Sequence, residues 1–293
     1  MINTKIDYTV SPGSTTTKDT NEDYLWVGSE DGINALLILD GTSGVSADFG
    51  AKNGKTGGRR YVEAFGESVK QKLKQEPQAD LEKVMKNAVK TVWNKFEEDA
   101  QKNSENYFNG NDVVLQRADT IPAAVGTLIK WDKENLEVLH VGDVETCVIT
   151  KEKTKNFSNK IHERFDNLRD KHIEKYGKDS KKVKEILRKH RSAHNLPGTY
   201  PNMSFNPLAV EKLGEKAEYK IEKVEKVLLS TDGASPRIRK LLNPENNKEV
   251  AKLIKNKGSE KVIDELRKKE QKANLNQLKT SDDAAIALIE FQK

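Results

Sequence analysis

The apolar residues of the chain form short continuous runs and stripes with helical spacing, and the first clear run spans residues 33–39. A continuous run of this length that ends at turn residues is typical of a buried β-strand, although a buried helical segment has the same pattern. The run ends at Asp40 and Gly41, and residues 227–230 lead in the same way, after one threonine, into Asp232 and a glycine. We therefore expect two strands that each place an aspartate at a strand end, where loops begin and binding sites are commonly built.

The middle of the chain is predicted to be rich in β-strands. Residues 123–131 are apolar and residues 136–141 alternate between apolar and polar positions, with a polar turn between them, which is the pattern of a hairpin. Gly142 and Asp143 then lead into residues 144–150, so we expect a third strand that extends the hairpin into a meander. Further strands are predicted at residues 24–27, 219–224, 226–230 and 284–291.

Helical stripes lie on either side of this β-rich region. Residues 61–73 and residues 81–96 each have one apolar face, and three later helices are predicted at residues 237–242, 248–256 and 259–273. Because the strands follow one another as hairpins and the helices are grouped, we expect an α+β fold in which antiparallel sheets are layered with helices. The absence of the motifs GxGxxG and GxxxxGK(S/T) agrees with this, since both mark parallel α/β folds that bind nucleotides.

Composition indicates the number of domains and the cellular compartment that we expect for this protein. The 293 residues contain no linker rich in Pro, Gly or Ser, so we expect one domain over residues 1–293. The mean hydropathy of −0.78 and the 33% of charged residues are typical of a soluble protein. No apolar run approaches the ~20 residues of a membrane span, and the N-terminus has no signal-peptide core. The lone Cys147 cannot form an internal disulfide, so we expect a cytoplasmic protein without a membrane partner, in which Cys147 packs in the core.

The charge of the chain is unevenly distributed. Residues 151–194 hold 15 Lys and Arg against 7 Asp and Glu, so this segment carries +8 while the whole chain carries +5. Apolar residues recur in it with helical spacing, which predicts a basic helical insertion at about residues 151–200: Ile161, Phe165 and Leu168 in one helix, and Val183, Ile186, Leu187 and His190 in another. Such a segment is either a solvated insertion or a surface that attracts anions, and no RNA-binding or zinc-finger motif favours nucleic acid. His190 and His194 are expected to serve in packing, capping or contact with solvent.

Acidic residues adjoin four of the predicted strands. Asn21-Glu22-Asp23 precedes one strand, Asp40 and Asp232 each follow another, and Asp282-Asp283 precedes the last. Carboxylates that lie together in a site of low dielectric repel one another. A bound cation would offset this repulsion, so the pattern favours a metal site. Oxygen ligands of this kind suit Mg²⁺ or Mn²⁺ and do not suit zinc or copper.

The order of these motifs, together with Val141-Gly142-Asp143 in mid-chain, resembles the protein phosphatase 2C family of metal-dependent (PPM-type) serine/threonine phosphatases, in its bacterial variety. The resemblance extends over roughly residues 18–289. It implies a four-layer α-β-β-α sandwich, in which two antiparallel sheets are flanked by helices. It also implies two divalent cations, Mn²⁺ or Mg²⁺, which lower the pKa of a water and stabilise its attack on the phosphate monoester of a phosphoserine or phosphothreonine protein.

The resemblance also implies roles for individual residues. Asp40 would bridge both metals, the carbonyl of Gly41 would bind one of them, and Asp232 and Asp282 would supply the remaining carboxylates, so the three aspartates are the predicted catalytic residues. Glu22 and Asp23 would hold metal-bound waters, and Asp283 is a neighbour that could replace Asp282. Asp143 would be a ligand of a third metal.

The chain departs from the family pattern at four places. Lys18, which is the predicted phosphate-binding residue, stands where the family usually has a phosphate-binding arginine. Thr42 stands where many members have a histidine proposed as the general acid. Val144-Glu145 replaces a common Ser-Arg pair. Ser235-Pro236 replaces a Trp-Asp pair, which removes the second aspartate that a third metal would need.

Two other classes of function compete with this hypothesis. One is a catalytically silent member of the family that acts as a binding or regulatory module, against which the retained carboxylates argue, because they would repel one another without a cation. The other is a metal-dependent nuclease that uses the basic segment to bind a nucleic-acid backbone. Activity on phosphate monoesters, on diesters or on neither would separate the three.

Overall fold

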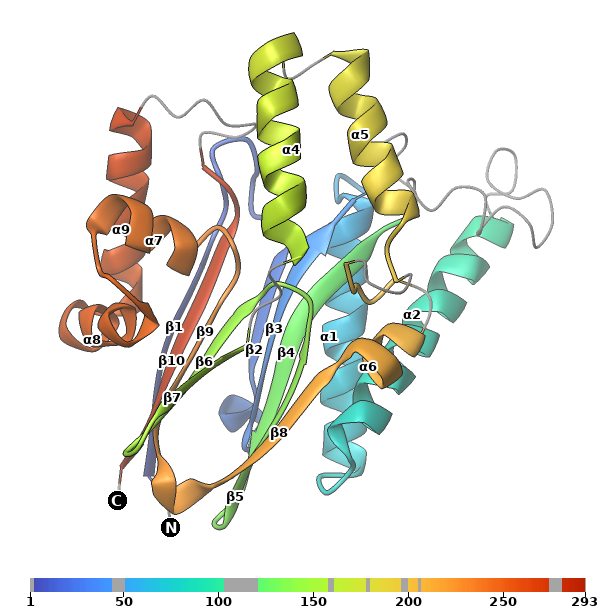
Figure 1. Cartoon of the computed structure of the whole chain (residues 1–293). Coiled ribbons are helices and arrows are strands. Elements are labelled where there is room, and N and C mark those ends of the chain that lie inside the picture. The colour runs from blue at the N-terminus through green and yellow to red at the C-terminus, as the bar shows by residue number, and fades with distance from the viewer. Residues whose placement is uncertain are drawn as a thin grey trace.

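The structure is a computed structural model that describes residues 3–43, 51–102, 121–157, 161–177, 180–195, 200–204, 207–273 and 281–292. Two five-stranded antiparallel sheets lie face to face at its centre (Figure 1). The first sheet has the spatial order β1 (Asn3–Ser11), β10 (Ala284–Gln292), β9 (Val224–Ser230), β6 (Glu145–Thr150) and β7 (Thr154–Phe157). The second has the order β2 (Asp23–Val27), β3 (Ala35–Thr42), β4 (Ala123–Trp131), β5 (Asn135–Val141) and β8 (Glu215–Lys220).

Helices cover the outer face of each sheet. α1 (Gly57–Gln75), α2 (Leu81–Lys102) and α6 (Leu208–Leu213) lie over the second sheet, and α7 (Ser235–Leu242), α8 (Asn247–Lys257) and α9 (Ser259–Lys272) lie over the first. The short 3₁₀ turns η1 (Gly28–Asp31) and η2 (Ile221–Lys223) connect strands. The predicted four-layer sandwich is therefore confirmed. Within the described residues, no helix is both long and apolar enough to cross a membrane.

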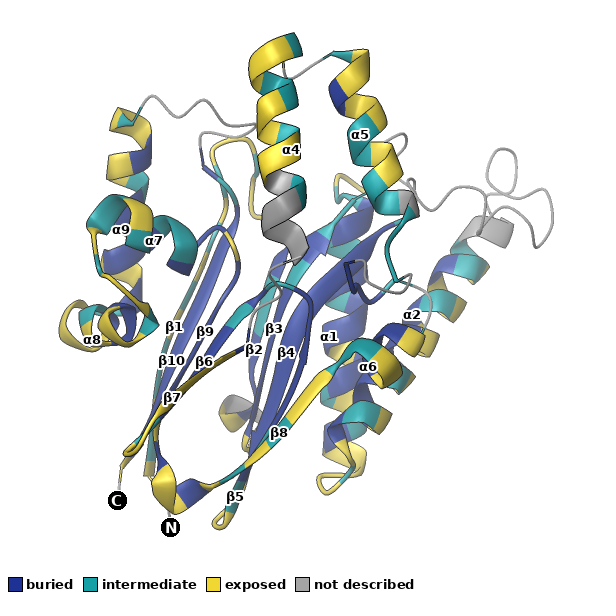
Figure 2. Ribbon diagram, viewed as in Figure 1, coloured by how far each residue is buried: buried dark blue, intermediate teal, exposed yellow. Residues whose placement is uncertain are grey.

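The strand that begins at Ala35 shows why a buried strand reads as a continuous apolar run. Leu36 and Ile38 pack into the core between the two sheets, whereas Leu37 and Leu39 pack against α1 and α2. Because both faces of β3 are buried (Figure 2), neither face can carry the polar residues that would produce an alternating pattern. A third core lies between the first sheet and α7, α8 and α9, and it includes Cys147, as predicted.

The prediction of a meander is wrong at its third strand. β5 pairs with β4 and β8, whereas β6 pairs with β9 and β7 in the other sheet. The chain changes sheets at Gly142, whose φ of +95° lies in the left-handed region that glycine adopts without strain. Local pattern identified the strand but not the sheet it joins, because β8, from far along the chain, occupies the edge of β5.

The sequence pattern also missed strands at the edges of the first sheet. β1 has no fully buried residue, and three of the four residues of β7 are exposed, so neither has an apolar run. β7 occupies the start of the segment predicted to be helical, and the two helices there are α4 (Ile161–Tyr176) and α5 (Lys181–Ser192). The helical spacing predicts that Leu168 lies on the apolar stripe of the first of these helices, but its side chain is 47% exposed. α4 and α5 project beyond the ends of the sheets, with mostly exposed or intermediate side chains (Figures 1 and 2).

Candidate functional site

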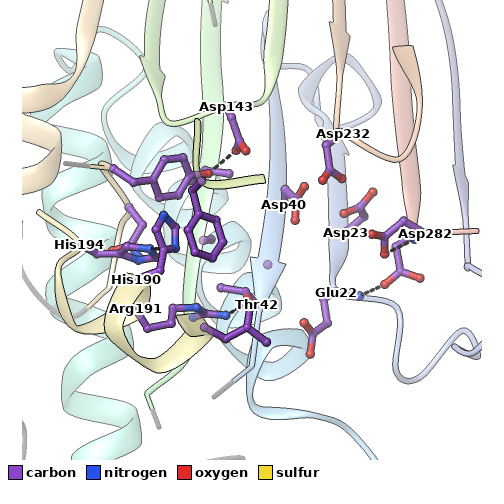
Figure 3. Close-up of a pocket in the computed structure, with 18 of the residues that line it drawn as sticks. Glu22, Asp23, Asp40, Thr42, Asp143, His190, Arg191, His194, Asp232 and Asp282 are labelled. Carbon is purple, nitrogen blue, oxygen red and sulfur yellow. Dashed lines mark hydrogen bonds between the residues drawn. The ribbon is translucent and has the colours of Figure 1, made fainter. Parts of the chain in front are cut away.

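A cavity of about 320 Å³ lies where α4 and α5 meet the ends of the two sheets. Carboxylates form one side of it (Figure 3). Of the predicted site residues, these line the cavity: Glu22, Asp23, Asp40, Gly41, Asp143, Asp232, Asp282 and Asp283. Lys18 does not line it, and its side chain is exposed in the loop between β1 and β2. The structure thus brings together the predicted carboxylates from five separate segments and leaves Lys18 outside.

Asp40 is held by strand pairing on both sides. β3 continues to Thr42, so Asp40 lies within the strand, where it pairs with Asp23 of β2 and with Val125 of β4. Burial raises the pKa of Asp40 well above its usual value, and the charge of Asp232, followed by those of other aspartates, raises it further. The strand register alone therefore places two carboxylates side by side in a poorly solvated position.

Two glycines allow the backbone to approach closely at the site. A Cβ atom on Gly41 would lie 2.6 Å from the carbonyl oxygen of Glu22, and the Gly41 N–H donates a 3.0 Å hydrogen bond to that oxygen. A Cβ atom on Gly233 would overlap the carbonyl oxygen of Asp283. The glycines that follow Asp40 and Asp232 therefore mark places where another acidic segment touches the backbone.

Asp23 accepts a hydrogen bond from Thr231, a residue that the sequence motifs do not mark. The Thr231 hydroxyl donates a 2.6 Å hydrogen bond to Oδ2 of Asp23, and the hydroxyl oxygen of Thr231 accepts a 2.9 Å hydrogen bond from the N–H of Ala285. Burial raises the pKa of Asp23 well above its usual value, the Thr231 hydrogen bond lowers it, and the neighbouring aspartates raise it. Thr231 thus links β2 of one sheet to the β9 and β10 ends of the other.

The neighbours Asp282 and Asp283 have different environments. Asp283 is buried, and its carboxylate accepts hydrogen bonds of 2.8 Å from the N–H groups of Gly13 and Glu22 and another from the Thr16 hydroxyl. It therefore holds the N-terminal loop against the start of β2. Asp282 is only half-buried at the cavity (Figure 3), which favours Asp282 over Asp283 as a ligand.

Glu22 organises the start of α1. Its carboxylate accepts hydrogen bonds from the Thr56 hydroxyl at 2.6 Å, from the Ser43 N–H at 3.1 Å and from the Ser43 hydroxyl. Thr56 also caps α1, since its hydroxyl oxygen accepts a 3.1 Å hydrogen bond from the N–H of Arg59. Arg59 in turn donates 3.0 Å hydrogen bonds to the carbonyl oxygens on either side of Glu22, those of Asn21 and Asp23.

The opposite wall of the cavity comes from the basic insertion and the segment after it. Its side chains are Phe165 and Arg169 of α4, Leu187, His190 and Arg191 of α5, and His194, Tyr200 and Asn202. The Tyr200 hydroxyl donates a hydrogen bond to Asp143, and burial raises the pKa of that hydroxyl well above its usual value. The sequence pattern predicts the helices but none of these contacts. The only sequence signal was the concentration of Arg and His in the insertion.

The chemistry of the acidic wall fits a hard divalent cation. In the part of the chain that the structure describes, no three His, Cys, Asp or Glu side chains converge closely enough to enclose a metal ion. The carboxylates nevertheless line one cavity, and their charges raise each other's pKa values. A divalent cation would offset this repulsion, and carboxylate and carbonyl oxygens are the ligands that Mg²⁺ and Mn²⁺ prefer.

Solved structures of bacterial phosphatases share the fold. The Mycobacterium tuberculosis serine/threonine phosphatase PstP/Ppp has 13% sequence identity and a TM-score of 0.53, with 100% of each chain covered. The catalytic domain of PstP in complex with 2 manganese ions also has 13% identity, with a TM-score of 0.50 over 100% of each chain. Stp1 from Staphylococcus aureus has 16% identity and a TM-score of 0.50, with 100% of this chain and 96% of that chain covered. At these identities the likeness shows a common fold.

The sequence itself gives a more direct assignment than the solved structures. The search of curated proteins finds no match. Residues 13–279, however, match the family model described as protein phosphatase 2C. This match includes all the strands of the second sheet and four of the five segments that bring carboxylates to the cavity. The chain therefore belongs to the protein phosphatase 2C family.

Proposed function

We propose that this protein is a metal-dependent serine/threonine phosphatase, which hydrolyses phosphate monoesters of phosphoproteins at the acidic cavity. The observation that carries the proposal is the pairing of Asp40 with Asp23 in one cavity with Asp232 and Asp282. These carboxylates come from separate segments and repel one another, so the fold bears an electrostatic cost that a bound cation would offset.

The residues divide into ligands and residues that position them. Asp40, the carbonyl of Gly41, Asp232 and Asp282 would hold two divalent cations, Mn²⁺ or Mg²⁺. When bound, such ions lower the pKa of a water and stabilise the charge that develops on the phosphate. Glu22, Asp23 and Asp283 hold the surrounding backbone and hydroxyl groups, and through these contacts they keep the ligand-bearing segments together.

A route through a cysteine nucleophile does not fit the structure. Cys147 is buried in the core between the first sheet and its helices, and it does not line the cavity. Burial raises the pKa of its thiol to about 12, so the thiolate that would act as a nucleophile is disfavoured. This supports attack by water at the acidic cavity.

The test is hydrolysis of an aryl phosphate, a bis-aryl phosphodiester and a phosphothreonine peptide, each with Mn²⁺ and with EDTA. We expect Mn²⁺-dependent release of phosphate from the monoester and from the peptide. Activity confined to the diester would select a nuclease instead. Binding of Mn²⁺ without hydrolysis of any of the three substrates would select a silent regulatory module.

A further inference from the structure

The C-terminal end of α5 brings a guanidinium group to the cavity that holds the acidic residues. Arg191 lines this cavity, and its Nη2 donates a 2.9 Å hydrogen bond to the carbonyl oxygen of Ser43 and another hydrogen bond to the Thr42 hydroxyl. Figure 3 shows Arg191 beside Thr42, which lies two residues after Asp40 on the same strand. A cationic side chain of the insertion is thus bound to the end of the strand that carries the central carboxylate.

The position of Arg191 is fixed by contacts at the end of its helix. At the opposite, N-terminal end of α5, Ser180 caps the helix by accepting a 3.3 Å hydrogen bond from the N–H of the buried Val183. One residue before Arg191, the ring of His190 stacks on Phe165 of α4, with 3.5 Å between ring centroids. Beyond the helix, the Asn195 N–H donates a 3.0 Å hydrogen bond to the carbonyl of Tyr200. The end of α5 is therefore held to the cavity wall from several sides.

A phosphate group in this cavity needs a cationic side chain as well as metal ions, because it brings two negative charges to a wall of carboxylates. Lys18, at the position where the resemblance predicts phosphate binding, is exposed and does not line the cavity. Among the described residues that line it, the Lys and Arg side chains are Arg169 and Arg191. Arg169 bonds Asp170 of its own helix at 3.0 Å, whereas Arg191 bonds Thr42, at the end of the strand that carries Asp40.

We propose that Arg191 binds the phosphoryl oxygens of the substrate, a role that the family pattern would give to position 18. This inference rests on the proposed phosphatase function. The Thr42 hydroxyl and the Ser43 carbonyl, which accept hydrogen bonds from its Nη2 group, are neutral oxygens. A phosphate oxygen is a charged acceptor, and charge-assisted hydrogen bonds are about twice as strong as neutral ones. The planar guanidinium has five N–H donors, so it can keep the Ser43 carbonyl while it presents two parallel donors to a phosphate.

Phosphate binding by Arg191 differs from a general electrostatic effect of the basic insertion. Its net charge could attract anionic substrates from a distance, but a steering effect depends on total charge and not on one side chain. A contact with the phosphate depends on the place of Arg191 in the cavity. Arg188 offers a matched control, because it lies on the same helix, carries the same charge, is exposed and does not line the cavity.

The test is calorimetric titration of inorganic phosphate into the Mn²⁺-loaded protein, for the wild type and for Arg191→Ala, Arg191→Lys, Arg188→Ala and Lys18→Ala. We expect Arg191→Ala to weaken phosphate binding about 10-fold or more, as the loss of a charged hydrogen bond does. Arg191→Lys should retain part of the affinity, because it keeps the charge but loses the planar fork. Arg188→Ala should bind phosphate within about twofold of the wild type, since steering changes rates more than affinity.

Two further measurements separate phosphate binding from a purely structural role of Arg191. The Mn²⁺ affinity without phosphate should be the same in Arg191→Ala and the wild type, and KM for an aryl phosphate should rise in proportion to the phosphate dissociation constant. Unchanged phosphate affinity in Arg191→Ala would overturn the proposal, as would an equal loss in Arg188→Ala or a loss in Lys18→Ala alone. A wild type that binds phosphate through Arg191 but hydrolyses no monoester would overturn the proposed function and leave this inference standing.

Discussion

At the scale of single residues, the site depends on groups that compensate buried charge. Asp23 is buried among other aspartates, and the one hydrogen bond shown to lower its pKa comes from Thr231. His140 is buried as well, two residues before the glycine at which the chain changes sheets. Its Nε2 lies 2.9 Å from the carbonyl oxygen of Gly142, which can only accept, so Nε2 carries the proton and Nδ1 accepts from the Thr127 hydroxyl at 2.9 Å.

Replacing Thr231 with valine should weaken both the fold and the site. The substitution keeps the shape of the side chain but removes the hydroxyl that bonds Asp23 and the N–H of Ala285. We expect the free energy of unfolding to fall by roughly 1–3 kcal/mol, because the buried Asp23 carboxyl group loses its donor and the Ala285 N–H loses its acceptor. Urea unfolding checks this, with Thr154→Val on the exposed edge strand as control. Equal stability of Thr231→Val and the wild type would contradict the role given to this hydrogen bond.

His140 should make the protein less stable in acid. Burial lowers its pKa from 6.5 to about 4. Below pH 6.5 the unfolded chain binds a proton that the folded chain does not bind until the pH falls to about 4, so stability decreases as the pH falls through this window. Between about pH 7.5 and about pH 5 this loss should be roughly 2 kcal/mol. It is measured as the difference between the wild type and His140→Gln in urea unfolding at both pH values. Parallel pH dependence in the two proteins would show that His140 titrates normally.

At the scale of secondary-structure elements, the site depends on how closely the loops between strands approach. The loop after β9 carries Asp232, the loop before β10 carries Asp282, and they meet at Gly233, where there is no room for a Cβ atom. The insertion approaches from the other side through α4 and α5. The contacts between the two loops thus fix the acidic side of the cavity, and α4 and α5 form the side that carries Arg169 and Arg191.

A Gly233→Ala substitution should separate the two acidic loops. Its Cβ atom would overlap the carbonyl oxygen of Asp283, so one loop must move. We expect weaker Mn²⁺ binding, by about 10-fold or more, since a shift of a ligand-bearing segment degrades coordination geometry. Isothermal titration of Mn²⁺ measures the affinity, and circular dichroism checks that the strands remain. Normal Mn²⁺ affinity would mean that Asp232 and Asp282 do not bind metal together.

The exposed lysines of the insertion should act on protein substrates and spare small ones. Lys171 of α4 and Lys181 and Lys184 of α5 are exposed and do not line the cavity. Replacing all three with glutamine should lower kcat/KM for a phosphopeptide at low salt, because the charge that attracts anions is reduced. An aryl phosphate in the same buffer serves as the comparison and should hardly be affected. If both substrates lose efficiency equally, the lysines support the structure of the insertion instead.

Sequence patterns were sufficient for most strands and helices and for the carboxylates. Asp40 and Asp232 could be found because an apolar run that ends in Asp-Gly is a local signal. The contacts that hold these aspartates in place could not be predicted from local patterns. Thr231 bonds Asp23 across 208 positions of sequence, and Arg191 bonds Thr42 across 149. The sheet that β6 joins was likewise unpredictable, because it depends on strands far along the chain.

At the scale of the whole molecule, the acidic cavity belongs to both sheets. Asp23 and Asp40 come from β2 and β3 of the second sheet, whereas Asp232 and Asp282 lie at the ends of β9 and β10 of the first. Asp143 lies where the chain crosses between them. The site is therefore assembled only when the two sheets pack through their shared core. The charge repulsion among its carboxylates opposes that packing, and a bound cation would offset this repulsion.

The most direct test of this account is the Mn²⁺-dependent release of phosphate from a phosphothreonine peptide by the wild type and by Asp40→Asn. The substitution keeps the size of the side chain but removes the charge at the centre of the acidic wall, and Asp264→Asn on the exposed face of α9 serves as the control. We predict robust activity for the wild type and the control, and at least about a 1,000-fold loss for Asp40→Asn at saturating Mn²⁺, as expected when a ligand shared by two metals is removed. Activity of Asp40→Asn within tenfold of the wild type would contradict the assignment of this cavity as the metal-dependent active site.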